Sequence, residues 1–172
     1  MRSAQCEVYK LAFVALGSNL GDSRRIILEA MARLQELSGQ PVLKSSLWQT
    51  TPVNCPPGSP LFVNAVVGFT PQKNEIPESL LQQLRALEKE FGRSPKTVLN
   101  VPRPLDLDLI AFGTETRNSP GLILPHPRAH LRRFVLQPLS EIAPDLILPG
   151  QSKTISQLLA ELLDEGTVMR LV

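Results

Sequence analysis

The chain has 172 residues, of which 42% are hydrophobic and 20% are charged, and these values are typical of one folded domain rather than a disordered or fibrous chain. Its 18 Lys and Arg residues against 16 Asp and Glu residues give a net charge of +2, which argues against a dedicated nucleic-acid binder. We therefore expect residues 1–172 to form a single domain without a nucleic-acid partner.

Hydrophobic periodicity and turn residues predict interleaved strands and helices along the chain. The predicted elements, in chain order, are a strand over 8–16, a helix that is capped by Asp22 or Ser23 and ends before Gly39, strands over 42–50 and 61–69, a helix from Pro77 to Gly92, a strand over 105–112, a helix over 155–163 and a strand over 168–172. Several connections are short or irregular. The pattern therefore favours an α+β fold with a mostly antiparallel sheet flanked by helices over a doubly wound parallel sheet.

Cysteine usage and hydropathy indicate the compartment. Cys6 and Cys55 lie far apart and match neither a zinc motif nor a disulfide framework, which is typical of free thiols in a reducing environment. The apolar run from Leu11 to Leu16 is too short for a signal peptide or a membrane span. We expect a cytoplasmic protein without a membrane anchor, and we expect it to be a monomer.

The sharpest motif is LDLDLI at 105–110, on a predicted strand. Successive side chains on a strand alternate between its two faces, so Asp106 and Asp108 project to the same side with about 7 Å between their Cα atoms. Both carboxylates can then reach one hard cation such as Mg²⁺, or two cations bridged by phosphate oxygens. The alternative for the bare motif is a half-exposed strand with an acidic outer face.

Cations crowd the same part of the chain. Between residues 93 and 133 there are seven Lys and Arg residues and three acidic ones, a local charge of +4. The cations are Arg93, Lys96, Arg103, Arg117, Arg128, Arg132 and Arg133. Carboxylates for a metal beside guanidinium groups for phosphate oxygens are what a triphosphate requires, although a solvated basic loop has the same charge.

Four further side chains stand out. Asn64 is an amide within an apolar strand, so it either bonds neighbouring backbone or reads the edge of a heteroaromatic ring. Phe62 and Phe134 are core residues or stack on such a ring. His126 lies in a stiff turn between two prolines, where it is either structural or a donor to phosphate.

Several blocks occur together in order: ALGSNLGD at 15–22, FVNA at 62–65, LEKEFGR at 87–93, PRPLDLDLI at 102–110 and LPHP at 124–127, followed by Arg132, Phe134, Pro138-Leu139 and Ala143-Pro144. Over residues 15–149 the chain resembles the 6-hydroxymethyl-7,8-dihydropterin pyrophosphokinase family of folate biosynthesis. The proline and arginine before LDLDL are its most diagnostic feature. The resemblance implies a ferredoxin-like α/β sandwich and transfer of pyrophosphate from ATP to the pterin hydroxymethyl group, with release of AMP.

The resemblance also implies roles for individual residues. Asp106 and Asp108 would hold two Mg²⁺ ions, and these aspartates with Arg93 and Arg103 would be the catalytic residues. The implied ATP-binding residues are Glu88, Arg93, Arg103, Leu109, His126 and Arg132. The implied pterin-binding residues are Thr50, Thr51, Pro52, Val53, Phe62, Asn64 and Phe134.

The chain departs from the family pattern around the mobile loop that the resemblance implies. Asn100-Val101 replace an aromatic residue and a glycine, Ser94-Pro95 lack a second arginine, and Pro127 replaces a common aromatic residue. Lys96 is a candidate for the missing charge.

Two other readings remain open from the residues alone. A glycosyltransferase-like enzyme would use the two aspartates to hold a metal and a nucleotide sugar, although such domains are usually longer. A non-enzymatic ferredoxin-like module with an exposed acidic strand would bind no nucleotide.

Overall fold

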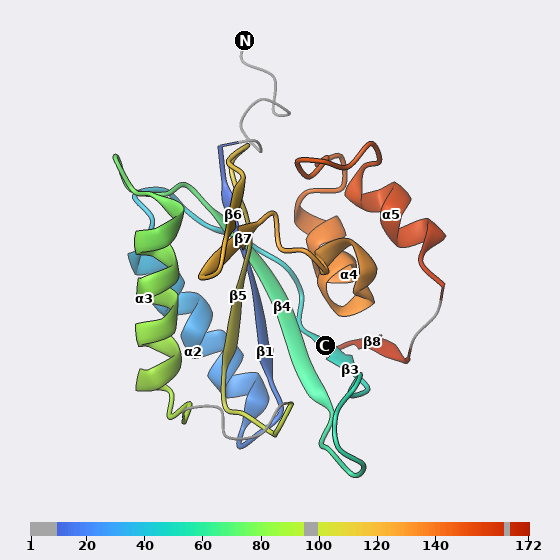
Figure 1. Cartoon of the computed structure of the whole chain (residues 1–172). Helices are drawn as coiled ribbons and strands as arrows, with labels where there is room; N and C mark the ends of the chain where they lie inside the picture. The colour runs from blue at the N-terminus through green and yellow to red at the C-terminus, as the bar shows by residue number, and fades with distance from the viewer. Residues whose placement is uncertain (1–9, 95–99, 164–165) are drawn as a thin grey trace.

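An antiparallel sheet runs through the centre of the computed structural model, which describes residues 10–94, 100–163 and 166–172 (Figure 1). Its strand order is β5-β1-β4-β3-β8, and β2 also pairs with β4. The strands are β1 (Ala12–Ser18), β2 (Leu43–Lys44), β3 (Trp48–Thr50), β4 (Phe62–Phe69), β5 (Asp106–Phe112) and β8 (Val168–Arg170). Every pair in this sheet is antiparallel, which confirms the predicted α+β class.

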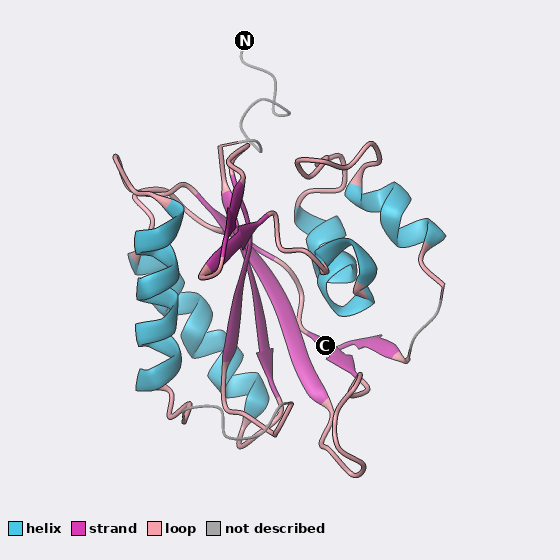
Figure 2. Ribbon diagram, viewed as in Figure 1, coloured by secondary structure: helices cyan, strands magenta, loops and turns pink. Residues whose placement is uncertain are grey.

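Helices cover both faces of the sheet (Figure 2). The helices α2 (Ser23–Glu36) and α3 (Pro77–Glu90) lie on one face, and α4 (Arg133–Ile142) and α5 (Ile155–Glu161) lie on the other. A short hairpin of β6 (Arg117–Ser119) and β7 (Leu122–Leu124) and a 3₁₀ turn, η1 (Ala129–Leu131), connect β5 to α4. None of the described helices is long and apolar enough to span a membrane.

Strand alternation divides the buried residues into two cores. Val14 and Leu16 of β1 pack toward α2 and α3, whereas Phe13 packs toward α4 and α5. The next two positions on the α4 side of β1 are Ala15 and Gly17, which are too small to fill the space above the sheet. The α4 face is therefore left open over one end of the sheet.

The predicted helix boundaries agree with local chemistry. Asp22 caps α2, and its Oδ1 accepts a hydrogen bond from the backbone N–H of Arg25 at 3.2 Å. Pro77 is the first residue of α3, where its missing N–H has no helical partner to lose. Gly92 follows this helix with a φ of +86°, a conformation that glycine adopts without strain.

Three parts of the prediction differ from the structure. The hairpin of β6 and β7 was not predicted. The single strand expected over 42–50 is two short strands, because Ser45 turns its hydroxyl to the backbone: its Oγ accepts from Val66 N at 2.9 Å and donates to Ser46 O at 2.8 Å. The helix α4 was not predicted. Pro138 lies inside it and is a helix breaker by pattern, yet Val135, Leu136 and other apolar side chains of α4 are fully buried.

Candidate active site

Strand register brings the predicted site residues to the open end of the sheet. Gly17 of β1 lies opposite Asn64 of β4 on one side and opposite Asp106 of β5 on the other. Ala15 lies opposite Asp108 in the same way. A Cβ atom on Gly17 would stand 3.2 Å from Asn64 Oδ1, so glycine keeps the floor between the amide and the aspartates clear.

A cleft of about 890 Å³, part of it open to solvent, lies over this floor. The residues that line it are Ala15, Leu16, Gly17, Thr50, Thr51, Val53, Cys55, Phe62, Asn64, Asn100, Arg103, Asp106, Asp108, His126, Arg128, Arg132 and Phe134. They come from strands β1, β3, β4 and β5, from the segment that precedes β5, from the segments that follow β3 and β7, and from the start of α4. The cleft thus has a charged end near β5 and an amide and aromatic wall near β3 and β4.

Asp106 is held by two arginines. Arg93 Nη1 lies 2.6 Å from Asp106 Oδ1, and Arg103 Nη2 lies 2.8 Å from Asp106 Oδ2. The same Arg93 Nη1 also pairs with Glu88 Oε1, which accepts a hydrogen bond from Leu107 N at 2.7 Å. The side chains of this cluster are between 11% and 19% exposed, so it forms a largely buried network that extends from the cleft lining to Glu88 and Arg93 behind it.

Burial and charge shift the pKa values in this network. Burial is the main reason that the pKa of Glu88 rises to about 7, and the nearby carboxylates of Asp106 and Asp108 add to the rise. The hydrogen bond from Leu107 N and the charge of Arg93 oppose it. Burial also disfavours the charge of Arg93, but Asp106 and Glu88 hold the pKa of Arg93 above its ordinary value.

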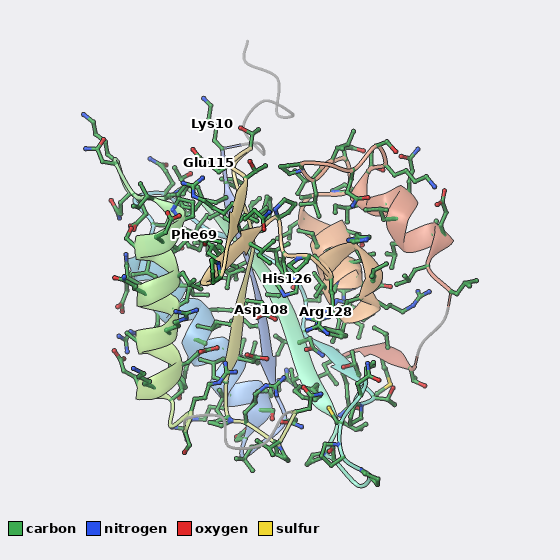
Figure 3. The ribbon with its side chains drawn as sticks, in the orientation of Figure 1. Lys10, Phe69, Asp108, Glu115, His126 and Arg128 are labelled. Carbon is green, nitrogen blue, oxygen red and sulfur yellow. The ribbon has the colours of Figure 1, made fainter. Side chains whose placement is uncertain are left out.

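Asp108 has a looser environment than Asp106. Arg132 Nη1 lies 3.8 Å from Asp108 Oδ2, and the Asp108 side chain is 37% exposed. Partial burial and the neighbouring Asp106 carboxylate raise the pKa of Asp108, whereas His126 and Arg132 lower it. Figure 3 shows Asp108, His126 and Arg128 close together between the sheet and α4.

His126 is oriented by two backbone contacts. Its N–H donates to Ile110 O at 2.8 Å, and its ring Nδ1 accepts from Arg128 N at 3.1 Å. Because Nδ1 is an acceptor, the neutral ring carries its proton on Nε2. Burial lowers the pKa of His126, with Arg132 and Arg128 acting in the same direction and Asp108 against it. His126 is therefore a neutral donor at the cleft wall.

The opposite wall combines an amide with aromatic rings. Asn64 is 4% exposed, and its Nδ2 donates to Thr50 Oγ1 at 2.7 Å. The guanidinium carbon of Arg103 lies 5.5 Å from the centroid of Phe62, and that of Arg132 lies 5.4 Å from the centroid of Phe134. Each aromatic ring thus connects the wall to an arginine of the charged end.

The cleft gathers most of the predicted site residues. Those that line it are Thr50, Thr51, Val53, Phe62, Asn64, Arg103, Asp106, Asp108, His126, Arg132 and Phe134. Glu88 and Arg93 lie behind it in the Asp106 network, and Pro52 is next to its lining. The side chain of Leu109 is 4% exposed and packs in the core with α2 and α3, on the other face of β5. Lys96 and Cys6 lie outside the described residues.

Sequence reasoning missed several lining residues, of which Arg128 is chemically the most important. It was counted in the basic segment but was given no role. Its position two residues after His126 and four before Arg132 was the available signal. No carboxylate pairs with Arg128 within the described parts of the chain, so its guanidinium is the cleft cation that is most available to a ligand.

The two aspartates fit Mg²⁺ that is shared with a substrate. Across the described residues, no three His, Cys, Asp or Glu side chains are grouped to hold a metal ion by themselves. Asp106 and Asp108 nevertheless lie on one face of β5 and both line the cleft. Because Mg²⁺ usually takes one or two carboxylates and fills its other positions with water and phosphate oxygens, this donor set suits it.

Comparison with known proteins places the chain in a family. The family model for 7,8-dihydro-6-hydroxymethylpterin-pyrophosphokinase (HPPK) matches residues 13–144. The chain belongs to this family. The resemblance inferred from the sequence is thereby confirmed, together with the reaction that defines the family: pyrophosphoryl transfer from ATP to hydroxymethyldihydropterin in folate synthesis.

Two curated relatives of this HPPK chain differ in length. The 2-amino-4-hydroxy-6-hydroxymethyldihydropteridine pyrophosphokinase of Pseudomonas aeruginosa is 40% identical over 157 residues, which cover 90% of this chain and 93% of that protein. The folic acid synthesis protein fol1 of Pneumocystis carinii is 39% identical over 153 residues, which cover 88% of this chain. The match spans only 20% of that longer protein.

A solved structure supports the HPPK fold. The wild-type HPPK-DHPS of Plasmodium falciparum with pteroate superposes with a TM-score of 0.67 at 15% identity, over 88% of this chain and 42% of that chain. The ferredoxin-like α/β sandwich predicted from the resemblance is therefore confirmed.

Proposed function

We propose that residues 1–172 form a single HPPK domain that carries out the family reaction in this cleft, with Mg·ATP at the charged end and the pterin against the amide and aromatic wall. The observation that carries the proposal is the row Asn64, Gly17 and Asp106 across three neighbouring strands. It places a group able to read a pterin edge and a group able to bind a metal on one open floor. Transfer between two substrates needs such a shared floor.

The metal site would be formed by Asp106 and Asp108, and we propose that it takes two Mg²⁺ ions. Bound Mg²⁺ would neutralise the charge that develops on the phosphates. Arg93 and Arg103 neutralise Asp106 in the structure, with N–O distances of 2.6 and 2.8 Å. A cation bound at Asp106 would neutralise this carboxylate in place of the two arginines. Both guanidinium groups could then turn to phosphate oxygens.

The remaining cations would bind the nucleotide. His126 offers its Nε2–H as a neutral donor, which suits a phosphate oxygen without adding a proton that titrates during turnover. Arg132 and Arg128 line the same end and repel each other, and burial together with Arg128 lowers the pKa of Arg132. A polyanion between them would relieve that repulsion.

The pterin would bind at the other wall. Asn64 would hydrogen-bond its edge, and Phe62 and Phe134 would stack on its ring, with the backbone over Thr50–Val53 closing the pocket. This placement would direct the hydroxymethyl oxygen toward the β-phosphorus of ATP. A bond would form between that oxygen and the β-phosphorus, and the hydroxyl proton would be released to solvent. The bond from the β-phosphorus to the oxygen that bridges to the α-phosphate would break, with AMP taking the electron pair.

The identity of the nucleotide product tests the proposal. Purified protein is incubated with ATP, Mg²⁺ and 6-hydroxymethyl-7,8-dihydropterin, and the products are separated by chromatography. We expect AMP in equal amount to the pterin diphosphate, and none when Mg²⁺ is chelated. Formation of ADP instead would indicate an ordinary kinase, and absence of both would contradict the proposal. In a separate incubation with a nucleotide sugar, its consumption would favour the glycosyltransferase reading.

A further inference from the structure

The strand β8 lies at the edge of the sheet beside the proposed pterin wall. Val168 pairs with Thr50, and just beyond this pair Thr51 N donates to Thr167 O at 3.2 Å. In return, Thr167 N donates to Thr51 Oγ1 at 3.2 Å. We propose that residues 166–170, the C-terminal brace, are a positioning element that fixes the pterin subsite. This inference rests on the proposed function.

A chain of contacts connects the brace to the floor of the cleft. Thr50, which pairs with the brace, accepts a hydrogen bond from Asn64 Nδ2 at 2.7 Å through its Oγ1. Both Thr50 and Asn64 are at most 5% exposed, so the hydrogen bond between them is shielded from water. In the structure, Asn64 Oδ1 faces Gly17 on the floor of the cleft. A shift of the backbone at Thr50 would turn the Asn64 amide and move this oxygen.

Gly166 is the residue that permits the close contact. It has a φ of +96°, and a Cβ atom at this position would lie 2.4 Å from Thr51 Oγ1. No real Cβ contact is this short, so any side chain would push Thr51 away from the brace. The other end of the brace is anchored independently, because Arg170 Nε donates to Ser46 Oγ at 2.9 Å and Leu171 N donates to Leu47 O at 2.8 Å.

The position of the brace predicts a selective effect. In the strand order β5-β1-β4-β3-β8, the brace is at the opposite edge from β5, which carries Asp106 and Asp108. Displacement of Thr51 should therefore weaken pterin binding and leave ATP binding nearly unchanged. A loss of general stability would instead affect both substrates alike.

The first experiment compares Gly166→Ala with Gly150→Ala. Gly150 also has a positive φ, +79°, but a Cβ atom there meets nothing within 4 Å, so it controls for backbone strain alone. We expect the KM for the pterin to rise on the order of tenfold in Gly166→Ala, with the KM for ATP within about twofold of the unaltered chain. Gly150→Ala should change neither. Equal increases for both substrates, or no increase for the pterin, would overturn the proposal.

A double-mutant cycle tests the contact itself. Thr51→Ala removes Oγ1, the atom that a Cβ at Gly166 would meet, so Gly166→Ala should raise the pterin KM less in that background. Strict additivity of the two substitutions would contradict the proposal. Arg170→Ala is a milder variant in case Gly166→Ala unfolds. It should give a smaller rise in the same KM, and an unchanged value would count against the brace.

Hydrogen exchange tests the contacts of the brace independently of the reaction. The backbone amide of Thr51, which donates to Thr167 O, should exchange faster in Gly166→Ala than in Gly150→Ala. Failure of the unaltered chain to form AMP would refute the proposed function. Normal AMP formation with an unchanged pterin KM in Gly166→Ala would refute the brace alone.

Discussion

Asp106 and Asp108 stand two residues apart on the same face of β5, yet their surroundings differ. Asp106 is 19% exposed and contacts two arginines, whereas Asp108 is 37% exposed and lies 3.8 Å from Arg132. Both carboxylates line the cleft, but the first belongs to a largely buried network that includes Glu88, whereas the second lies farther from its arginine. Two residues with the same proposed function therefore contribute differently to the fold.

The largest expected effects are on activity at these two aspartates. Asp106→Asn and Asp108→Asn should each lower kcat/KM by at least about a thousandfold, because each removes a proposed metal ligand. Their stabilities should differ. Asp106→Asn leaves Arg93 and Arg103 without a charged partner in a largely buried site and should cost about 1–2 kcal/mol. Asp108→Asn should be neutral or stabilising at pH 7, since burial and, to a smaller extent, the Asp106 carboxylate disfavour the charge of Asp108.

Urea unfolding and steady-state kinetics check both halves of this prediction, with the exposed Asp145→Asn as a matched control. Retention of near-normal activity in both aspartate variants would remove the metal assignment. Equal losses of stability would mean that the contrast between the two surroundings has no energetic consequence.

An intermediate effect is expected at Arg128, the cleft arginine with no carboxylate partner among the described residues. Arg128→Ala should raise the KM for ATP by roughly tenfold, because a charge-assisted contact to phosphate is lost, and should leave the pterin KM unchanged. The effect should shrink as salt is added. Arg85→Ala, on the outer surface of α3, is the control. An unchanged ATP KM in Arg128→Ala would show that the open end of the cleft does not contact the phosphates.

The smallest effect concerns pH and the buried network behind Asp106. Because the pKa of Glu88 is about 7 in the fold and near its ordinary value when unfolded, the native state binds the extra proton. The contribution of Glu88 to stability is thus complete below about pH 4.5 and is lost as the pH rises through 7. Glu88→Gln should abolish this loss.

Urea titrations at pH 5, 6, 7 and 8 in the presence of a chelator measure the difference. The unaltered chain should lose stability relative to Glu88→Gln between pH 5 and 8. Parallel curves for the two proteins would indicate that Glu88 is ionised throughout and that the network is not desolvated.

Alternation along single strands made much of the site predictable. The face shared by Asp106 and Asp108 follows from a period of two residues and needs no knowledge of the partners of the strand. The strand predicted over 8–16 stops before Gly17, because the importance of Gly17 depends on which residues lie opposite it on two neighbouring strands. Strand register of this kind is a property of long-range pairing and is not visible in a local pattern.

Side-chain direction accounts for other differences. Glu88 was placed near the nucleotide, but its carboxylate turns to Leu107 N and Arg93. Leu109 was grouped with the ATP residues, and its side chain points into the core because it alternates with Asp108. The helix α4 was hidden by Pro138, since local propensity gave a break where burial against β4 holds the helix together.

The row of Asn64, Gly17 and Asp106 fixes the spacing between the amide and the first aspartate. Two steps between adjacent strands of about 4.8 Å each place the amide and the first aspartate about 10 Å apart, measured along the hydrogen-bonding direction. Backbone hydrogen bonds set this distance, so changes in the surrounding loops can alter the affinity for the substrates without altering the distance. In the proposed mode of binding, the distance from the pterin edge to the transferred phosphorus would therefore depend on the stiffness of the sheet, and substrates of a different length would fit the cleft less well.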